Sequence, residues 1–329
     1  MKKIEAEYEI VTPMFIGGGD KHEEPEVRPP SIKGALRFWW RALQWGSCLK
    51  QAEGNADKAL QALHEQEAEL FGAAFKDNQY GQGLCTLKLK NVIPKGVEEN
   101  WPISNNNSGS GYLGYGLDKT TDEAHRKAIS KGKFTVCLML KKGISTEQIQ
   151  QLKNTLIIWG LLGGIGSRAR RGFGSVAIKK LDDKSYKFDN LGQYEAAINL
   201  LLNTIILAPE MPVFTALNEA MHIAHAGQGN DVRRLMDRVG SQYKNARKEA
   251  GPGLAKLPFG LPLDGTHGPS ENDRRSSPLF MHIHPIKKQF VAMISFIPAD
   301  FHPDYQQGKQ LEFYKPLQDY MQQMERVYP

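Results

Sequence analysis

The stretch STEQIQQLKNTLIIWGLLGGIGSRARRGFGSVAI, residues 145–178, decides the fold of the chain around it. Its first four residues, Ser145-Thr-Glu-Gln148, form a capping-box motif that is typical of a helix start. Apolar residues at helical spacing then predict one buried helix face, made of Ile149, Leu152, Leu156 and Trp159. A turn rich in glycine and arginine follows over 163–174, and Val176–Ile178 predicts a strand. The stretch therefore predicts a helix, a turn and a strand in close succession.

The preceding chain supplies the other elements of one small domain. Apolar residues alternate with glutamates over Ile4–Ile10, which indicates a half-buried strand. A helix is expected after Pro29-Pro30-Ser31, and its apolar side carries Ile32, Leu36, Trp39, Trp40 and Leu43. A further helical stretch is expected over Asp57–Phe71, and further strands at Leu84–Val92 and Phe134–Leu140. The resulting β-α-β-β-α-β order is the ferredoxin-like arrangement, which includes the RRM topology.

A second, less regular domain is expected after residue 182, so that residues 1–182 and 183–329 form two units. Its predicted elements are strands at Met211–Leu217, Leu279–Ile283 and Phe290–Phe296, a helix after Asn230 and a last helix over 311–324. This order is one strand short of a second copy. The sequence thus predicts an α+β protein with two tandem ferredoxin-like (RRM-like) domains, the second of which is degenerate. The first domain also carries a long polar insertion near 101–133.

The composition excludes several classes of protein. The chain has 329 residues, 40% of them hydrophobic, and contains no apolar stretch suited to a membrane span or a signal peptide. Cys48, Cys85 and Cys137 are too scattered for a disulfide framework or a CxxC zinc site, so a reducing, cytoplasmic compartment is expected. The net charge of +6 is mild, so the placement of the basic residues matters more than their excess.

The turn over 163–174 is the most informative candidate site. Glycines let a backbone approach a ligand and offer N–H groups to an anion, while Arg168, Arg170 and Arg171 add positive charge. Because the turn follows a helix C-terminus, the arginines must supply the attraction, which favours a polyanion. The turn matches neither a Walker A loop nor a G-x-G-x-x-G fingerprint, and no small-molecule cofactor is expected. The alternative is a glycine-rich β-turn with solvated arginines.

Three further basic groups are candidates for the same partner. Lys33, Arg37 and Arg41 recur at helical spacing, with no acidic residue between Arg28 and Arg41. Arg234 and Arg238 stand one turn apart on a predicted helix, and Arg274-Arg275 precedes a strand. For each group the alternative is a solvated surface. In the insertion, Tyr112 or Tyr115 could stack on a base, and the alternative is a mobile insertion that becomes ordered only against a partner.

Catalytic candidates are few. His22 could act as a general acid or base in a metal-free ribonuclease. The pairs His222/His225 and His282/His284 have no third ligand nearby in the sequence, so no metal site is expected.

Several of these segments together resemble a known family. They are IVTPMFIGGGD (10–20), RPPSIKGALRFWWR (28–41), ELFG (69–72), the turn over 163–174 and RRSSPL (274–279). They are similar to the RAMP superfamily of CRISPR proteins, and within it to the first-numbered RAMP subunits of type III-B (Cmr) effector complexes.

The resemblance implies tandem ferredoxin-like domains and an antiviral subunit that caps its complex near the crRNA 3′ end. The implied partners are crRNA, single-stranded target RNA and the other Cmr-type RAMP subunits. In this family the target-cutting residue belongs to the repeated backbone subunit, so no catalytic residue is carried over. On this resemblance, contacts to the RNA backbone are expected from Lys33, Arg37, Arg41, Arg168, Arg170 and Arg171.

Three functions follow from these observations. The first is a non-catalytic RNA-binding subunit of a type III-B complex. The second is a metal-independent RAMP endoribonuclease that processes CRISPR RNA, with His22 at its site. The third is a scaffold whose basic rows bind acidic partner subunits.

Overall fold

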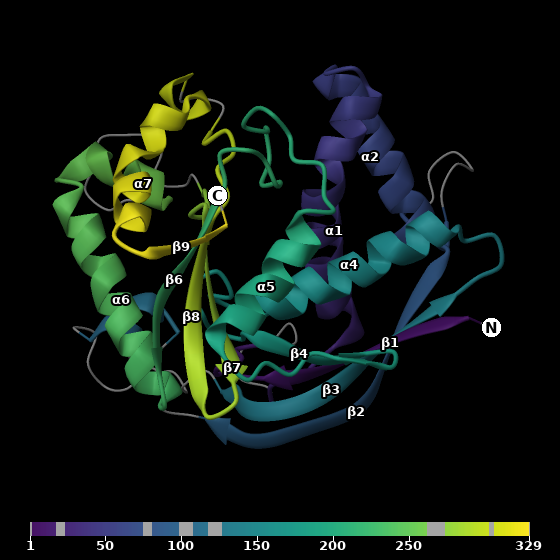
Figure 1. Ribbon diagram of the computed structural model, residues 1–329, viewed down its shortest axis with the longest axis horizontal. Helices are drawn as coiled ribbons and strands as arrows, with labels where there is room; N and C mark the ends of the chain where they lie inside the picture. Colours follow the sequence, from purple (N-terminus) through teal and green to yellow (C-terminus); the bar gives the residue numbers. More distant parts are fainter. Residues whose placement is uncertain are drawn as a thin grey trace.

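Two antiparallel sheets form the framework of the computed structural model (Figure 1). It describes residues 2–17, 24–74, 81–98, 108–117, 127–261, 274–302 and 306–328. Within them the first sheet has the strand order β2-β3-β1-β4-β5 and the second has β7-β8-β6-β9. Both orders, read with the intervening helices, are those of a ferredoxin-like unit. The fold is therefore a tandem of two such units, as the sequence predicts.

The first unit has the elements that the sequence predicts, with one added helix and one added edge strand. They are β1 (Lys3–Ile10), α1 (Pro29–Gln51), α2 (Ala56–Phe71), β2 (Cys85–Glu98), α3 (Gly109–Leu113), β3 (Ala128–Leu140), α4 (Thr146–Leu162), β4 (Val176–Leu181) and β5 (Lys184–Ser185). The capping box at Ser145 and Gln148 is confirmed, with both of its hydrogen bonds at 3.0 Å. Strands β2 and β3 reach further than predicted, and β3 takes up the end of the expected insertion from Ala128 onward.

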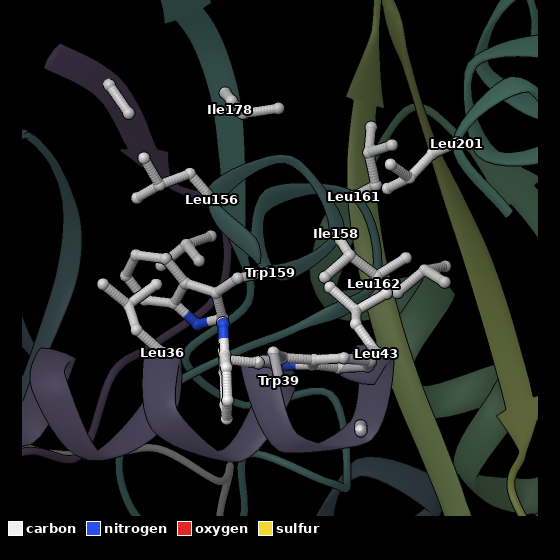
Figure 2. Close-up of a cluster of buried hydrophobic side chains, with 14 of the residues drawn as sticks. Leu36, Trp39, Leu43, Leu156, Ile158, Trp159, Leu161, Leu162, Ile178 and Leu201 are labelled. Carbon is white, nitrogen blue, oxygen red and sulfur yellow. The ribbon is translucent and has the colours of Figure 1, made fainter. Parts of the chain in front are cut away.

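Helices α1 and α4 cover one face of the first sheet and supply most of its core (Figure 2). Leu36, Trp39 and Leu43 of α1 lie against the apolar side of α4. The ring of Trp159 lies 4.7 Å from that of Tyr8 in β1. At Gly160 a Cβ would come within 2.5 Å of the Ile178 Cβ, so only glycine lets α4 approach β4 this closely.

The second unit is more complete than predicted. Its elements are α5 (Leu191–Leu202), β6 (His222–Gly229), α6 (Val232–Glu249), η1 (Gly253–Phe259), β7 (Leu279–Ile286), β8 (Gln289–Phe296), η2 (Gln306–Lys309), η3 (Leu311–Tyr314), α7 (Lys315–Gln322) and β9 (Glu325–Tyr328). The fourth strand that seemed to be missing is β9, which at four residues is too short to show an alternating pattern.

The prediction of a first strand at Met211–Leu217 is wrong. That segment is a loop packed on α1, where the N–H of Leu217 donates to the carbonyl of Ala42 at 3.0 Å. The strand is β6 instead, whose two histidines and two glycines hide its pattern from the sequence.

The two units pack directly against each other and share part of their hydrophobic core. The hydroxyl of Tyr194 in α5 donates to the Leu161 carbonyl of α4. A second core combines Val11, Phe15 and Phe173 of the first unit with the apolar side of α6 and the second sheet. The first sheet continues through β5, just past residue 182, and a domain boundary at that residue stays a prediction.

Candidate nucleic-acid interface

The turn over 163–174 is held by the protein's own carbonyl groups. The N–H of Ser167 donates to Phe15 at 2.8 Å, that of Ile165 to Gly174 at 2.9 Å, and that of Gly174 to Pro13 at 2.9 Å. A Cβ on Gly174, whose φ is +61°, would lie 1.9 Å from the Ile165 carbonyl oxygen. The glycines are needed for this tight packing. The prediction that the glycines offer N–H groups to an anion is wrong for Gly174, whose N–H is taken up by the Pro13 carbonyl.

Arg170 joins the two units. Its guanidinium lies between two rings, 4.3 Å from the centre of Phe280 in β7 and 5.5 Å from that of Phe38 in α1. Its Nη1 donates to the Ser277 carbonyl at 2.8 Å. Burial, reinforced by the charge of Arg275, lowers the pKa of Arg170 to about 10. The structure thus gives Arg170 a structural role between the two units, and its contact with RNA stays a prediction.

Arg171 is engaged in the same way. Its guanidinium lies 5.0 Å from the ring centre of Tyr243 in α6. The backbone beside it pairs with β7, where the N–H of Met281 donates to the Arg170 carbonyl at 3.0 Å. Two of the three predicted arginines therefore hold the second unit against the first.

Arg168 differs from its neighbours because its side chain is exposed. It adopts a left-handed backbone conformation with φ of +61°. Its Nε and Nη2 donate to the Tyr115 carbonyl at 3.1 and 2.6 Å. The structure thus brings together two features that the sequence shows 53 residues apart, the turn and the aromatic residues of the insertion.

Helix α3 fixes this part of the insertion on α6. The backbone N–H and the hydroxyl of Ser110 donate to Oδ1 of Asp237 at 3.0 and 2.9 Å. These bonds, the backbone one foremost, lower the pKa of the Asp237 carboxyl. The helices approach closely, since a Cβ on Gly240 would lie 2.1 Å from the Gly109 carbonyl oxygen.

Helix α6 presents more arginines beside α3. Arg234 and Arg238 are exposed and stand one turn apart, on the side of α6 next to Asp237. The Nη2 of Arg238 donates to the Gln228 carbonyl at 2.6 Å, and the Nη1 of Arg247 donates to the Tyr112 hydroxyl at 3.2 Å. We call this set the outer arginine face, and its members are Arg168, Arg234, Arg238, Arg247, Tyr112 and Tyr115.

The basic row on α1 is not part of this face. The Nε of Arg37 and Nη1 of Arg41 both bind Oε1 of Glu67 in α2, at 2.7 and 2.6 Å. Glu67 is only 4% exposed. Helices α2 and α6 lie on opposite sides of the molecule (Figure 1). Glu67 sits four residues after buried Leu63 on the apolar side of α2, which is the sequence signal that was missed.

The remaining predicted residues are placed separately. Lys33 is half-buried on α1 near Cys85. Burial raises the pKa of the Cys85 thiol to about 11, and the positive charge of Lys33 partly opposes that rise. Arg274 is exposed, whereas Nη2 of Arg275 donates to the Asp300 carbonyl at 2.7 Å.

The face of the first sheet that points away from α1 and α4 does not resemble an RRM platform, which stacks bases on aromatic rings. Strand β1 places Glu5, Glu7 and Glu9 at its centre. Nζ of Lys3 and of Lys90 bind Glu5 at 2.8 and 2.6 Å and lower its pKa to about 2.

The pair His282/His284 forms a buried hydrogen-bonded chain with the turn over 163–174. Nδ1 of His282 donates to the Gly163 carbonyl at 2.7 Å, so its Nε2 accepts from Nδ1 of His284 at 3.2 Å. Burial lowers the pKa of both, to about 4 for His282. No three His, Cys, Asp or Glu side chains gather as a metal site in the part of the chain that the structure describes. His22 lies outside the described residues.

Comparison with known proteins identifies the family. The model of the RAMP superfamily matches residues 7–177, just over half of the chain, so the chain belongs to the RAMP superfamily. It is 26% identical to the CRISPR system Cmr subunit Cmr1-1 of Pyrococcus furiosus, across 91% of this chain and 89% of that protein. It is also 26% identical to subunit Cmr1-2 of that organism, across 53% of this chain and 93% of that protein.

Solved structures share the fold over the whole chain. The apo crystal structure of Cmr1 from Pyrococcus furiosus matches with a TM-score of 0.68 and 23% identity, covering 100% of this chain and 99% of that one. A chain of the cryo-EM structure of the type III-B Cmr-beta bound to cognate target RNA matches with a TM-score of 0.63 and 14% identity, covering 98% and 99%. No helix among the described residues is long and apolar enough to cross a membrane.

Proposed function

We propose that this chain is a non-catalytic RNA-binding subunit of a type III-B CRISPR effector complex. In this role it contacts crRNA near its 3′ end, contacts target RNA and packs against other Cmr-type RAMP subunits. Membership of the RAMP superfamily and the similarity to Cmr1-1 across nine-tenths of the chain support the assignment. The matching chain in a Cmr assembly bound to target RNA supports it at the level of the fold.

The outer arginine face is the observation that carries the proposal. Arg168, Arg234 and Arg238 are exposed, so their positive charge is available to attract phosphates. Tyr115 is strongly exposed beside Arg168 and offers a ring on which a base can stack. Proteins that bind single-stranded RNA combine a positively charged track for the backbone with aromatic side chains on which bases stack. The face involves α6, the turn over 163–174 and α3, so both units contribute to it.

The test is RNA binding by the purified chain at a series of salt concentrations. End-labelled single-stranded RNA is titrated with wild-type protein and with the variant Arg168→Ala/Arg234→Ala/Arg238→Ala. Each phosphate contact contributes about 0.7 to the slope of log affinity against log salt for a single strand. The triple variant should therefore lower that slope by about 2, without changing sequence preference.

The matched control removes the same charge elsewhere. Lys50, Lys58 and Lys142 are exposed on other elements, and their triple alanine variant should keep the wild-type slope. Equal slopes for both triple variants would contradict the assignment of this face. Discrete RNA cleavage that survives EDTA would overturn the non-catalytic role and direct attention to His22.

A further inference from the structure

A pocket of about 260 Å³ opens at one edge of the second sheet, between that sheet and α7. Strand β9 forms this edge of the sheet, next to β6, and α7 ends just before β9 begins (Figure 1). Among the described residues that line it, none belongs to the outer arginine face or to the turn over 163–174. We call it the edge pocket. Its polar and apolar lining includes His222 and Ala224 of β6, Gln318, Met321 and Gln322 of α7, and Arg326 of β9.

The sheet register sets one cation at the edge pocket and keeps the neighbouring acid away from it. Arg326 pairs with Ala224 across the two strands, whereas Glu325 pairs with His225. Because neighbouring residues of a strand point to opposite faces, Arg326 shares the face of Ala224, and Glu325 lies on the other face. There its Oε2 is 3.7 Å from Nδ1 of His225. No described residue that lines the pocket is acidic, so the pocket has a single permanent charge, which is positive.

Arg326 and His222 offer unused hydrogen-bond donors beside the pocket. Nη2 of Arg326 donates to Nδ1 of His222 at 2.9 Å. A guanidinium only donates, so Nδ1 accepts and the neutral imidazole carries its proton on Nε2. Burial and the charge of Arg326 lower the pKa of His222, which agrees with a neutral ring. Within the described part of the chain, neither Nε2 of His222 nor Nη1 of Arg326 has a hydrogen-bond partner.

The remaining lining is apolar or neutral. Gln318, Met321 and Gln322 recur at a spacing that places them on one side of α7. Met321 is buried and Met324 is half-buried, and both line the pocket. Methionine side chains adapt to apolar groups of different shape, and the two glutamine amides add neutral donors and acceptors. The pocket thus combines an adaptable apolar surface with one positive charge.

The size and the charge of the pocket select the ligand. Sites that enclose a drug-sized molecule measure roughly 300–1,000 Å³, so this pocket fits something smaller. We propose that the edge pocket binds a carboxylate carried directly beside an apolar group, as in a small apolar carboxylic acid or the C-terminal residue of a protein. The carboxylate lies against Arg326 and His222, and the apolar group against Met321 and Met324.

Other anions match this lining less well. A phosphate monoester carries a charge of about −1.5 to −2 at pH 7, more than one arginine balances. An RNA phosphodiester carries one charge, but it lies between two polar riboses that leave the methionine surface unused. The pocket is separate from the outer arginine face, so its ligand does not depend on the proposed function.

Titration of the full chain with a matched pair of small molecules tests the ligand class. The methionine methyl groups are labelled with ¹³C and followed by NMR, and Met321→Leu and Met324→Leu assign the two resonances. N-acetylleucine should shift both resonances saturably, with a Kd of about 1 mM for a ligand of this size. N-acetylleucinamide keeps the apolar group and lacks the negative charge, so it should bind about tenfold more weakly.

Variants at two adjacent glutamines test the position of the site. Gln322→Glu places a negative charge on the pocket lining and should weaken binding of N-acetylleucine about tenfold. Gln323→Glu is the matched control, since Gln323 is the next exposed residue and does not line the edge pocket, and it should bind like wild type. Arg326→Gln should weaken binding as Gln322→Glu does. All three positions are exposed, so the thermal unfolding midpoints should stay at the wild-type value.

Three results would each overturn the assignment. They are the absence of saturable shifts at Met321 and Met324, equal binding of N-acetylleucine and its amide, and equal affinity of Gln322→Glu and Gln323→Glu for N-acetylleucine. Saturable shifts of the same two resonances with single-stranded RNA, and none with N-acetylleucine, would make the pocket a nucleic-acid site instead.

Reconstitution of the effector complex distinguishes the two sources of the carboxylate. Labelled wild type, Gln322→Glu and Gln323→Glu are each added to a complex assembled without this chain. Weaker incorporation of Gln322→Glu alone would identify the C-terminal residue of a partner subunit. Equal incorporation of all three would identify a free acid. A wild-type chain that joins no complex counts against the subunit role, whereas the NMR titration still decides the ligand of the pocket.

Discussion

Arg170 and Arg168 stand two positions apart in one turn, yet they have opposite environments. Arg170 is enclosed by Phe38, Phe280 and the Ser277 carbonyl, where the turn meets α1 and β7. We call this region the junction, and we include His282 in it because its Nδ1 donates to Gly163 of the same turn. Arg168 is exposed on the outer arginine face, where its guanidinium donates to the Tyr115 carbonyl just after α3.

The difference shows what a run of arginines conveys. A guanidinium can bind a phosphate, or it can stack on aromatic rings and donate to carbonyls inside the protein. The second unit supplies rings to Arg170 and Arg171, whereas Arg168 donates to the Tyr115 carbonyl. The density of arginines in the sequence therefore identified the turn over 163–174 as a notable feature, but it did not predict which of its arginines is exposed.

The largest expected effect is on the junction. Arg170→Ala removes a charge-assisted hydrogen bond and two ring contacts, and should lower the free energy of unfolding by about 2–3 kcal/mol. Urea denaturation followed by tryptophan fluorescence measures it. Arg168→Ala is the matched control and should stay within about 0.5 kcal/mol of wild type. Equal values for the two variants would remove the distinction between the regions.

The buried histidines give the junction a pH dependence. Both pKa values are lowered by burial, so below pH 6.5 the unfolded chain takes up protons that the native protein does not. Stability is thus complete above pH 6.5 and is lost as the pH falls toward 4. Between pH 6.5 and 5, before most carboxylates titrate, the free energy of unfolding should drop by about 1–2 kcal/mol per histidine.

His284→Phe tests this pH dependence. His284 stacks on Tyr194 with ring centres 4.3 Å apart, so phenylalanine should keep the packing and remove one histidine's share of the drop. His64→Phe, on an exposed part of α2, is the control and should leave the pH profile unchanged. A wild-type free energy that is flat between pH 6.5 and 5 would contradict the prediction.

The basic row on α1, Lys33, Arg37 and Arg41, is intermediate between the junction and the outer arginine face. The variant Glu67→Gln measures how much the ion pairs of Arg37 and Arg41 contribute to stability. The amide removes the charge that binds Arg37 and Arg41, whose side chains are each 35% exposed. Because solvent screens both arginines, the expected loss is about 1 kcal/mol. Glu65→Gln on the exposed side of α2 should cost nothing measurable. Unchanged stability with tighter RNA binding in Glu67→Gln would instead make the row an RNA surface.

The smallest expected effect separates single arginines by RNA binding. Arg168→Ala should lower the salt slope by about 0.7 and weaken binding a few-fold. Arg171→Ala, whose guanidinium lies over Tyr243, should leave the slope unchanged. Titrations at four or more salt concentrations give both slopes. A larger fall for Arg171 than for Arg168 would reverse the comparison.

Local pattern predicted much of the fold. The alternation of β1, the capping box of α4 and the apolar side of α1 each concern residues within a few positions of one another. Strand β9 was not predicted because four residues are too few to show an alternating pattern. Strand β6 was not predicted because histidines and glycines interrupt its pattern. Loop 211–217 looked like a strand because it is apolar, but its backbone binds α1.

The sequence by itself determined the ferredoxin-like order of the first unit, the RAMP resemblance and the turn over 163–174 as the central feature. Only the tertiary structure decided which basic residues are available. Glu67 reaches Arg41 across 26 residues, and Ser277 reaches Arg170 across 107. The physical reason is that helix and strand periods act over a few residues, whereas burial of a guanidinium depends on groups that distant segments bring to it.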